Sequence, residues 1–123
     1  MEKPSNVTFS WFNSFLMDVV DSNRVLILVR PSNTTHNGFL LTEDRGKNWK
    51  QIDHPFTNGS YGFISISMLK NGSIWVAYDD KIYANTSNEP FSGKWELQYS
   101  DTNLTKFILY VKMFDTMKGI AMG

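Results

Sequence analysis

Short runs rich in Val, Ile, Phe, Tyr and Trp alternate along the chain with clusters of Gly, Asn, Asp, Ser and Pro. No segment keeps an apolar residue every three to four positions for three helical turns, whereas short apolar runs between turn clusters are typical of strands. The pattern therefore predicts an all-β protein. The expected strands are residues 15–20, 24–30, 38–42, 47–52, 63–69, 73–78, 81–84, 94–99 and 107–114, with a last strand after a turn at 115–119.

The order of these pieces repeats along the sequence. Trp95 lies 46 residues after Trp49, and Ile120 lies 46 residues after Ile74. Repeats of about 40 to 50 residues with four antiparallel strands each are typical of β-propeller blades. We expect repeats at about 15–53, 63–100 and 107–123, the third being incomplete. The chain 1–123 is then a single all-β domain or a propeller fragment, and a sandwich or barrel of about ten strands is the competing fold.

The apolar runs also predict burial. Residues 25–29 and 107–111 are continuously apolar, as expected for strands that are buried on both faces. Residues 63–68 alternate instead, which indicates a strand that is buried on one face or packed with small polar groups.

Composition excludes several classes of function. Twelve basic and twelve acidic residues cancel, so the chain lacks the basic footprint of a nucleic-acid-binding protein. Cysteine is absent, which excludes disulfides, thiolate metal sites and cysteine nucleophiles. No apolar run is long enough to span a membrane, and residues 1–6 do not resemble a secretory leader. If the protein is exported, we expect its leader to be missing from this sequence.

Six Asn-x-Ser/Thr sequons are more than the composition would give by chance. They indicate N-glycosylation and favour an extracellular or lumenal protein. The alternative is that Asn, Gly and Ser simply accumulate in the turns of a hairpin-rich chain. The candidate acceptors are Asn6, Asn33, Asn58, Asn71, Asn85 and Asn103.

The segment 42–49 places Thr42, Asp44, Gly46 and Trp49 at T-x-D-x-G-x-x-W spacing. This spacing predicts a hairpin closure. The glycine adopts a conformation that other residues resist, the aspartate accepts bonds from loop amides, and the tryptophan packs where the return strand begins. A metal site at Asp44 would need converging carboxylates, and only Glu43 is adjacent.

The segment 42–49 resembles the Asp box, or BNR repeat, of sialidase-like and sortilin-like β-propellers. Residues 114–123 are similar, more weakly, to the blade openings of photosystem II assembly factor relatives. In the second repeat, residues 92–95 keep only the glycine and the tryptophan. The resemblance implies that Thr42, Asp44, Gly46 and Trp49 are structural. No cofactor is expected.

Enzymatic chemistry finds little support in the sequence. A sialidase needs a cluster of arginines for the substrate carboxylate, and this chain has only Arg24, Arg30 and Arg45. His36 and His54 lack metal-ligand spacing, so no metal is expected. The acidic pair Asp79 and Asp80 lies between two expected strands and predicts a turn. No catalytic residue is assigned.

An incomplete set of blades leaves unpaired strand edges, which the rest of a longer protein, a partner protein or further copies of the chain would cover. We therefore expect a non-enzymatic interaction or assembly module that binds a protein. A sialidase-like protein that binds or hydrolyses glycans, of which this chain is a fragment, is the alternative. The aromatic residues expected to contribute to binding are Trp11, Trp75, Tyr78 and Trp95.

Overall fold

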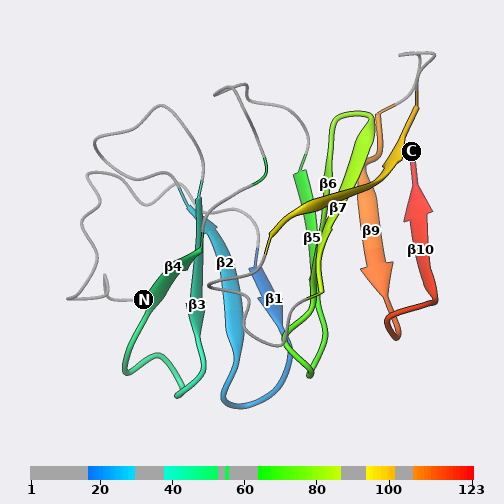
Figure 1. The fold of residues 1–123 in the computed structure, drawn as a ribbon. Helices are drawn as coiled ribbons and strands as arrows, with labels where there is room; N and C mark the ends of the chain where they lie inside the picture. Colours follow the sequence, from blue (N-terminus) through cyan, green and yellow to red (C-terminus); the bar gives the residue numbers. More distant parts are fainter. Residues whose placement is uncertain (1–16, 30–37, 53–54, 56–63, 87–93, 102–106) are drawn as a thin grey trace. The chain divides into compact units, whose positions relative to one another are not determined.

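The computed structural model describes residues 17–29, 38–52, 55, 64–86, 94–101 and 107–123. Within these residues the chain forms ten β-strands and no helix (Figure 1). The chain divides into two compact units, residues 1–60 and 61–123. The prediction of an all-β protein is confirmed, and so is the prediction of antiparallel sheets of four strands.

The first unit contains a four-stranded antiparallel sheet. Its strands pair in chain order, so each strand is hydrogen-bonded to the one that follows it in the sequence. They are β1 (Met17–Val19), β2 (Val25–Val29), β3 (Gly38–Thr42) and β4 (Lys50–Ile52). Ile27, Leu40 and Trp49 form a buried cluster in this unit, with Val25 packed against them. Leu26 and Ile27 point to opposite faces of β2 and both are buried, as the apolar run predicted.

The second unit contains another four-stranded antiparallel sheet with the same strand order. Its strands are β5 (Ile64–Met68), β6 (Ile74–Tyr78), β7 (Lys81–Asn85) and β8 (Glu96–Ser100). The register of β7 and β8 shifts between Ile82 and Tyr83, which opposes Ile82 to Tyr99 and Tyr83 to Leu97. Gln98 is therefore an extra residue on β8 at this bulge.

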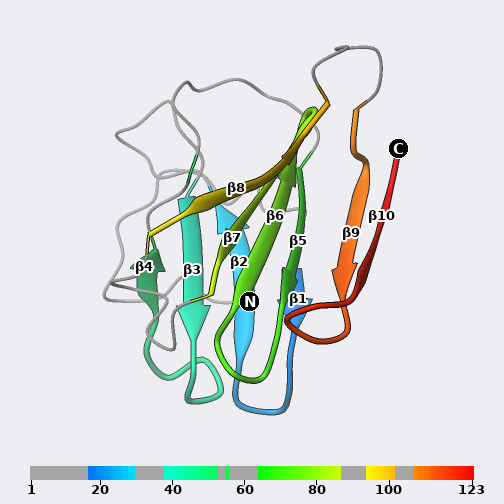
Figure 2. The ribbon, with the colours of Figure 1, turned by 45° about the vertical axis from the view of Figure 1, so that its right-hand side comes forward.

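A hairpin of β9 (Tyr110–Met113) and β10 (Gly119–Met122) follows in the second unit. β9 packs over β5 and β6 (Figure 2). Ile108 and Val111 are buried against Trp75, Ala77 and Ala84 of the sheet, and Leu69, Ile82 and Met113 add to the cluster. The backbone N–H groups of Val111 and Met113 donate to Ser65 Oγ and Ser67 Oγ, each at 3.0 Å.

These bonds explain the alternating pattern of β5. Ser65 and Ser67 are buried on the face that β9 covers, where small hydroxyl side chains allow the β9 backbone to approach and also accept its N–H groups. Of the two expectations for this strand, packing with small polar groups is confirmed. The expectation of a doubly buried run at residues 107–111 was wrong, because Phe107, Leu109 and Tyr110 are exposed.

The first hairpin of each sheet closes in the same way. A backbone N–H donates to the carbonyl oxygen four residues later in Val20 to Arg24, Leu69 to Ser73 and Phe114 to Lys118. A side chain inside each turn accepts further amides. Asp21 Oδ1 accepts Asn23 and Arg24, Asn71 Oδ1 accepts Ser73, and Asp115 Oδ1 accepts Met117 and Lys118. The same kind of turn therefore occurs three times in the described part of the chain: in the first sheet, in the second sheet and in the two-stranded β9–β10 hairpin.

Candidate functional site

The segment 42–49 forms a hydrogen-bonded turn between β3 and β4. Thr42 Oγ1 donates to Asp44 Oδ1 at 2.9 Å and accepts the Gly46 N–H at 2.8 Å. Asp44 Oδ1 also accepts the Asn48 N–H at 2.9 Å, while Asp44 Oδ2 accepts Asn48 Nδ2 at 2.7 Å. Both carboxylate oxygens of Asp44 are thus used within the turn.

Gly46 and Trp49 complete this turn. Gly46 has φ of +84° and follows Arg45 at +63°, so two successive residues adopt left-handed conformations. A side chain at Gly46 would be strained there. The indole Nε1–H of Trp49 donates to the Gly46 carbonyl at 3.1 Å, which satisfies the polar atom of a ring that is otherwise buried.

The electrostatics of this turn suit a structural role. The backbone and side-chain amides of Asn48 lower the pKa of the Asp44 carboxyl below its ordinary value. In the described part of the chain, no group of three or more His, Cys, Asp or Glu residues could hold a metal ion. His36 and His54 lie outside the described residues.

The described arginines lie at the turns of the first unit. Arg45 Nε donates to Asn23 Oδ1 at 2.9 Å, and the Arg45 N–H donates to the Asn23 carbonyl. Arg24 Nε lies 3.7 Å from Glu43 Oε1. Arg30 lies outside the described residues. Arg24 and Arg45 thus hold the β1–β2 and β3–β4 turns together, and neither lines the cavities described below.

Asp79 and Asp80 form the turn between β6 and β7, as expected. Asp79 has φ of +52°, and its carbonyl accepts the Ile108 N–H, while the Asp80 carbonyl accepts the Asp101 N–H. The carboxylate of Asp80 lies 2.6 Å from Lys81 Nζ and accepts Ser100 Oγ at 3.4 Å. The Lys81 ammonium lowers the pKa of Asp80, and the Asp80 carboxylate raises that of Lys81. This corner anchors the segments on either side of residues 102–106.

Exposed apolar side chains gather at the C-terminal hairpin. Eleven large hydrophobic residues of the described part are exposed, and seven of these lie between positions 107 and 122. Tyr110 pairs with Met122, and Lys112 with Ile120, so Tyr110, Ile120 and Met122 share the hairpin face opposite to Val111. We call these three residues the outer hairpin face. The other exposed members are Phe107, Leu109, Phe114 and Met117.

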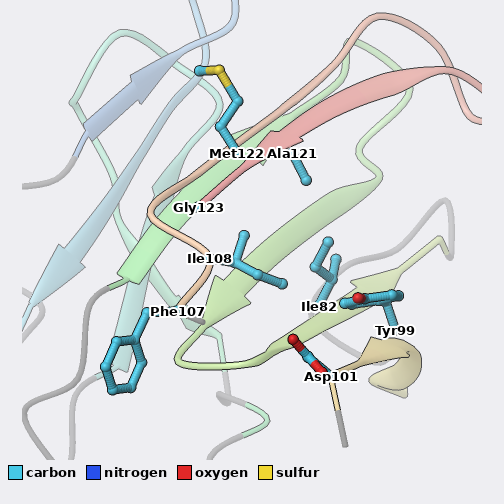
Figure 3. A pocket seen from close by; sticks show the side chains of 8 residues that line it. All are labelled: Ile82, Tyr99, Asp101, Phe107, Ile108, Ala121, Met122 and Gly123. Carbon is cyan, nitrogen blue, oxygen red and sulfur yellow. The ribbon is translucent and has the colours of Figure 1, made fainter. Parts of the chain in front are cut away.

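Two adjoining cavities lie between β10 and the sheet strands β7 and β8. The first, of about 450 Å³, is drawn in Figure 3. The side chains of Ala121 and Ile108 point toward Ile82, whereas Met122 points the opposite way. The second, of about 380 Å³, also reaches Ile82 and Ala121. Tyr99, which lines the first cavity, is 52 % exposed. We call the two cavities together the β10 groove.

The groove runs beside an edge of β10 that no described strand occupies. Among the described strands β10 pairs with β9 alone. Phe114 N–H donates to the Lys118 carbonyl across the hairpin, and backbone groups alternate between strand edges, so Ile120 and Met122 direct theirs toward β9. The backbone groups of Gly119 and Ala121 then point to the other edge, beside the groove.

The predicted binding aromatics are not brought together. Trp75 is 4 % exposed and packs in the core with Ala77 and Ala84, and it also lines the second cavity of the β10 groove. Tyr78 is half-buried, and burial raises the pKa of its hydroxyl. Trp95 is half-buried as well, and Trp11 lies outside the described residues.

The sequons fall into three groups. Asn71 is exposed in the β5–β6 turn. Asn85 is 0 % exposed, so in the folded protein we expect no glycan there. The remaining acceptors, Asn6, Asn33, Asn58 and Asn103, lie outside the described residues.

The residues of the outer hairpin face and the groove were not singled out from the sequence. Tyr110, Ile120 and Met122 lie within runs that resemble core strands. No local signal in these runs distinguishes them from the runs that form buried strands.

No family model, curated protein or solved structure matches this chain. The described residues include no helix with the length and apolar character needed to cross a bilayer.

Proposed function

We propose that this protein is a non-enzymatic interaction module that binds a protein partner through its C-terminal hairpin. The observation that carries the proposal is the outer hairpin face. Ile120 is 47 % exposed and Met122 is 56 % exposed, on a strand whose inner neighbour Ala121 faces the sheet. Gathered apolar side chains on a soluble surface are typical of protein-binding sites.

The sheets are proposed to be blades of an Asp-box β-propeller. Two features support this proposal. The turn at residues 42–49 uses the threonine, aspartate, glycine and tryptophan that the Asp-box resemblance singles out. In addition, β9 packs face to face on the sheet one repeat earlier, as the strands of successive blades do. The rest of the ring would come from a longer chain, from a partner or from further copies of the chain.

An extracellular or lumenal setting is proposed with this function. The six sequons support it, and the exposure of Asn71 gives one acceptor that a glycan can occupy in the folded protein. Glycan recognition by the chain itself has no comparable support. Arg24 and Arg45 are engaged at turns rather than directed into the β10 groove.

The test is the mass of the purified protein in solution as its concentration is raised. We expect association beyond the 14.2 kDa monomer, because the outer hairpin face covers itself when the partner is missing. Ile120→Lys should reduce the association, and Gln51→Lys, which adds the same charge at an exposed position in β4, should not. A stably folded wild-type monomer at all concentrations would contradict the proposal.

A further inference from the structure

The β5–β6 turn contains an asparagine followed directly by a glycine, Asn71 and Gly72. In such a pair the backbone nitrogen of the glycine can attack the side-chain carbonyl carbon of the asparagine. Glycine has no Cβ to hinder that approach, whereas other following residues do. The products are a cyclic succinimide and ammonia. The reaction is therefore controlled by how the folded turn holds the two groups.

The reaction needs only water as a co-reactant. The backbone nitrogen of Gly72 loses its proton and bonds to Asn71 Cγ, while the bond from Cγ to Nδ2 breaks and Nδ2 leaves with that proton as ammonia. Water then opens the ring at one of its two carbonyl carbons. Attack at Asn71 Cγ gives aspartate. Attack at the backbone carbonyl carbon of Asn71 gives isoaspartate, in which the main chain runs through the side chain.

The folded turn exposes the side-chain amide and buries the nitrogen that would attack it. Asn71 is exposed, whereas Gly72 is buried. The Gly72 N–H donates to the Leu69 carbonyl at 3.0 Å, so the proton that has to leave is held inside the turn. Asn71 Oδ1 accepts the Ser73 N–H at 3.0 Å, which holds the carboxamide against Ser73. A buried and bonded amide releases its proton only when the structure around it opens.

The closure of this turn depends on a main chain of normal length. Besides the bond from Gly72, the Leu69 N–H donates to the Ser73 carbonyl at 2.9 Å. An isoaspartate at position 71 adds a carbon atom to the main chain between Asn71 and Gly72. The two closing bonds could then no longer form together. Because the turn sets the register of the strands it joins, the β5–β6 ladder would be disturbed as well.

We propose that Asn71 is a site of spontaneous deamidation that the closed β5–β6 turn restrains, and that the isoaspartyl product keeps the turn open. A transient opening of the turn is thereby converted into a permanent covalent change. Its effect extends beyond the turn, because Ser65 and Ser67 of β5 accept the bonds that hold β9. A glycan on Asn71 would occupy the leaving nitrogen, so glycosylation and deamidation of this residue exclude each other.

The experiment follows deamidation in the full chain, produced in a host that does not glycosylate, by peptide mapping after incubation with and without urea. Asn37 and Asn58, which lie outside the described residues, are also followed by glycine and serve as references for the unfolded chain. In urea the three asparagines should deamidate at similar rates. Without urea, deamidation of Asn71 should be slower by about tenfold or more, because the Gly72 amide is protected.

A matched pair of proteins isolates the effect of the added main-chain carbon. Isoaspartyl protein purified from the incubated sample and Asn71→Asp have the same composition and charge, but only the first has an altered main chain. The β5 and β6 amides should exchange faster in the isoaspartyl protein. They should stay close to wild type in Asn71→Asp, whose Oδ1 can still accept the Ser73 N–H. Asn71→Gln should show no deamidation at this position, since its longer side chain closes a ring far more slowly.

Three outcomes would overturn the inference. One is deamidation of Asn71 in the folded protein at the rate measured in urea, which would show that the closed turn gives no protection. Another is an unmodified Asn71 in urea while Asn37 and Asn58 react. The third is equal protection of the β5–β6 amides in the isoaspartyl protein and in Asn71→Asp. None of these measurements involves the outer hairpin face or a partner, so Ile120→Lys tests the proposed function separately.

Discussion

The backbone N–H of Val111 donates to Ser65 Oγ at 3.0 Å, and the two residues are 46 positions apart. Met113 and Ser67 repeat the same bond at the same separation. This spacing equals the interval between Trp49 and Trp95 in the sequence. β9 therefore packs on β5. Each is the first strand of its repeat, and the residues in contact occupy equivalent positions in the two repeats.

Replacing Ser65 with alanine should destabilise the second unit. Val111 is buried, so its N–H would lose its acceptor without gaining water, at a cost of about 1–2 kcal/mol. Chemical denaturation followed by tryptophan fluorescence would measure the loss. Ser22→Ala, in the exposed β1–β2 turn, is the matched control and should change stability little. Equal stabilities of the two variants would show that the Ser65 bond contributes nothing net.

The free energy of unfolding should fall at acid pH because Asp44 becomes protonated. Its folded-state pKa is lowered from 3.8 by the amides of Asn48, so the unfolded state takes up protons first as pH drops. The stabilisation by Asp44 is fully present above the pKa of its carboxyl in the unfolded state. It is lost as pH falls through the pKa of that carboxyl in the folded state. The difference in unfolding free energy between wild type and Asp44→Asn should therefore shrink below about pH 4. A difference that stays constant down to pH 2 would contradict this prediction.

Gly46 and Gly119 should respond to alanine for different reasons. At Gly46 the nearest atoms to an added Cβ are 3.8 Å away, so the cost is the left-handed backbone alone, about 1–2 kcal/mol. At Gly119 the Cβ would lie 2.8 Å from the Lys112 carbonyl oxygen, and the backbone would have to move. Gly119→Ala should therefore expose the β9–β10 amides to hydrogen exchange, whereas Gly46→Ala should lower the melting temperature and leave that hairpin intact.

Glycan occupancy should separate Asn71 from Asn85. After expression in a glycosylating host, Asn71→Gln should remove one glycan from the mass of the folded protein, because Asn71 is exposed. Asn85→Gln should leave the glycan mass unchanged, since Asn85 is buried. Mass spectrometry of the intact variants makes the comparison. A glycan at Asn85 in folded protein would show that this end of β7 opens.

The strands were largely predictable because their patterning is local. Residues 38–42 were assigned without error between a polar connection and the Thr42 turn. Residues 107–114 were expected to form one strand, but β9 spans only Tyr110–Met113. In 107–109, Ile108 donates to the Asp79 carbonyl and Leu109 to the Met122 carbonyl, contacts that depend on distant segments.

The candidate site was not predictable in the same way. Phe107 and Ile108 are equally apolar neighbours, yet the first is exposed and the second is buried. The difference arises from which side of the chain faces the sheet, and periodicity within one segment does not determine that. Tyr99 resembles a core aromatic in the sequence, yet it is 52 % exposed and lines the first cavity.

The turn closures at Val20, Leu69 and Phe114 have a consequence for how the chain folds. Each joins residues only four positions apart, and an Asx side chain in the same turn adds its own bonds. Forming such a loop costs little chain entropy, so all three hairpins can form early and independently of one another. We therefore expect the docking of preformed hairpins to be the slow step, and the bonds that Ser65 and Ser67 accept to form at that later stage.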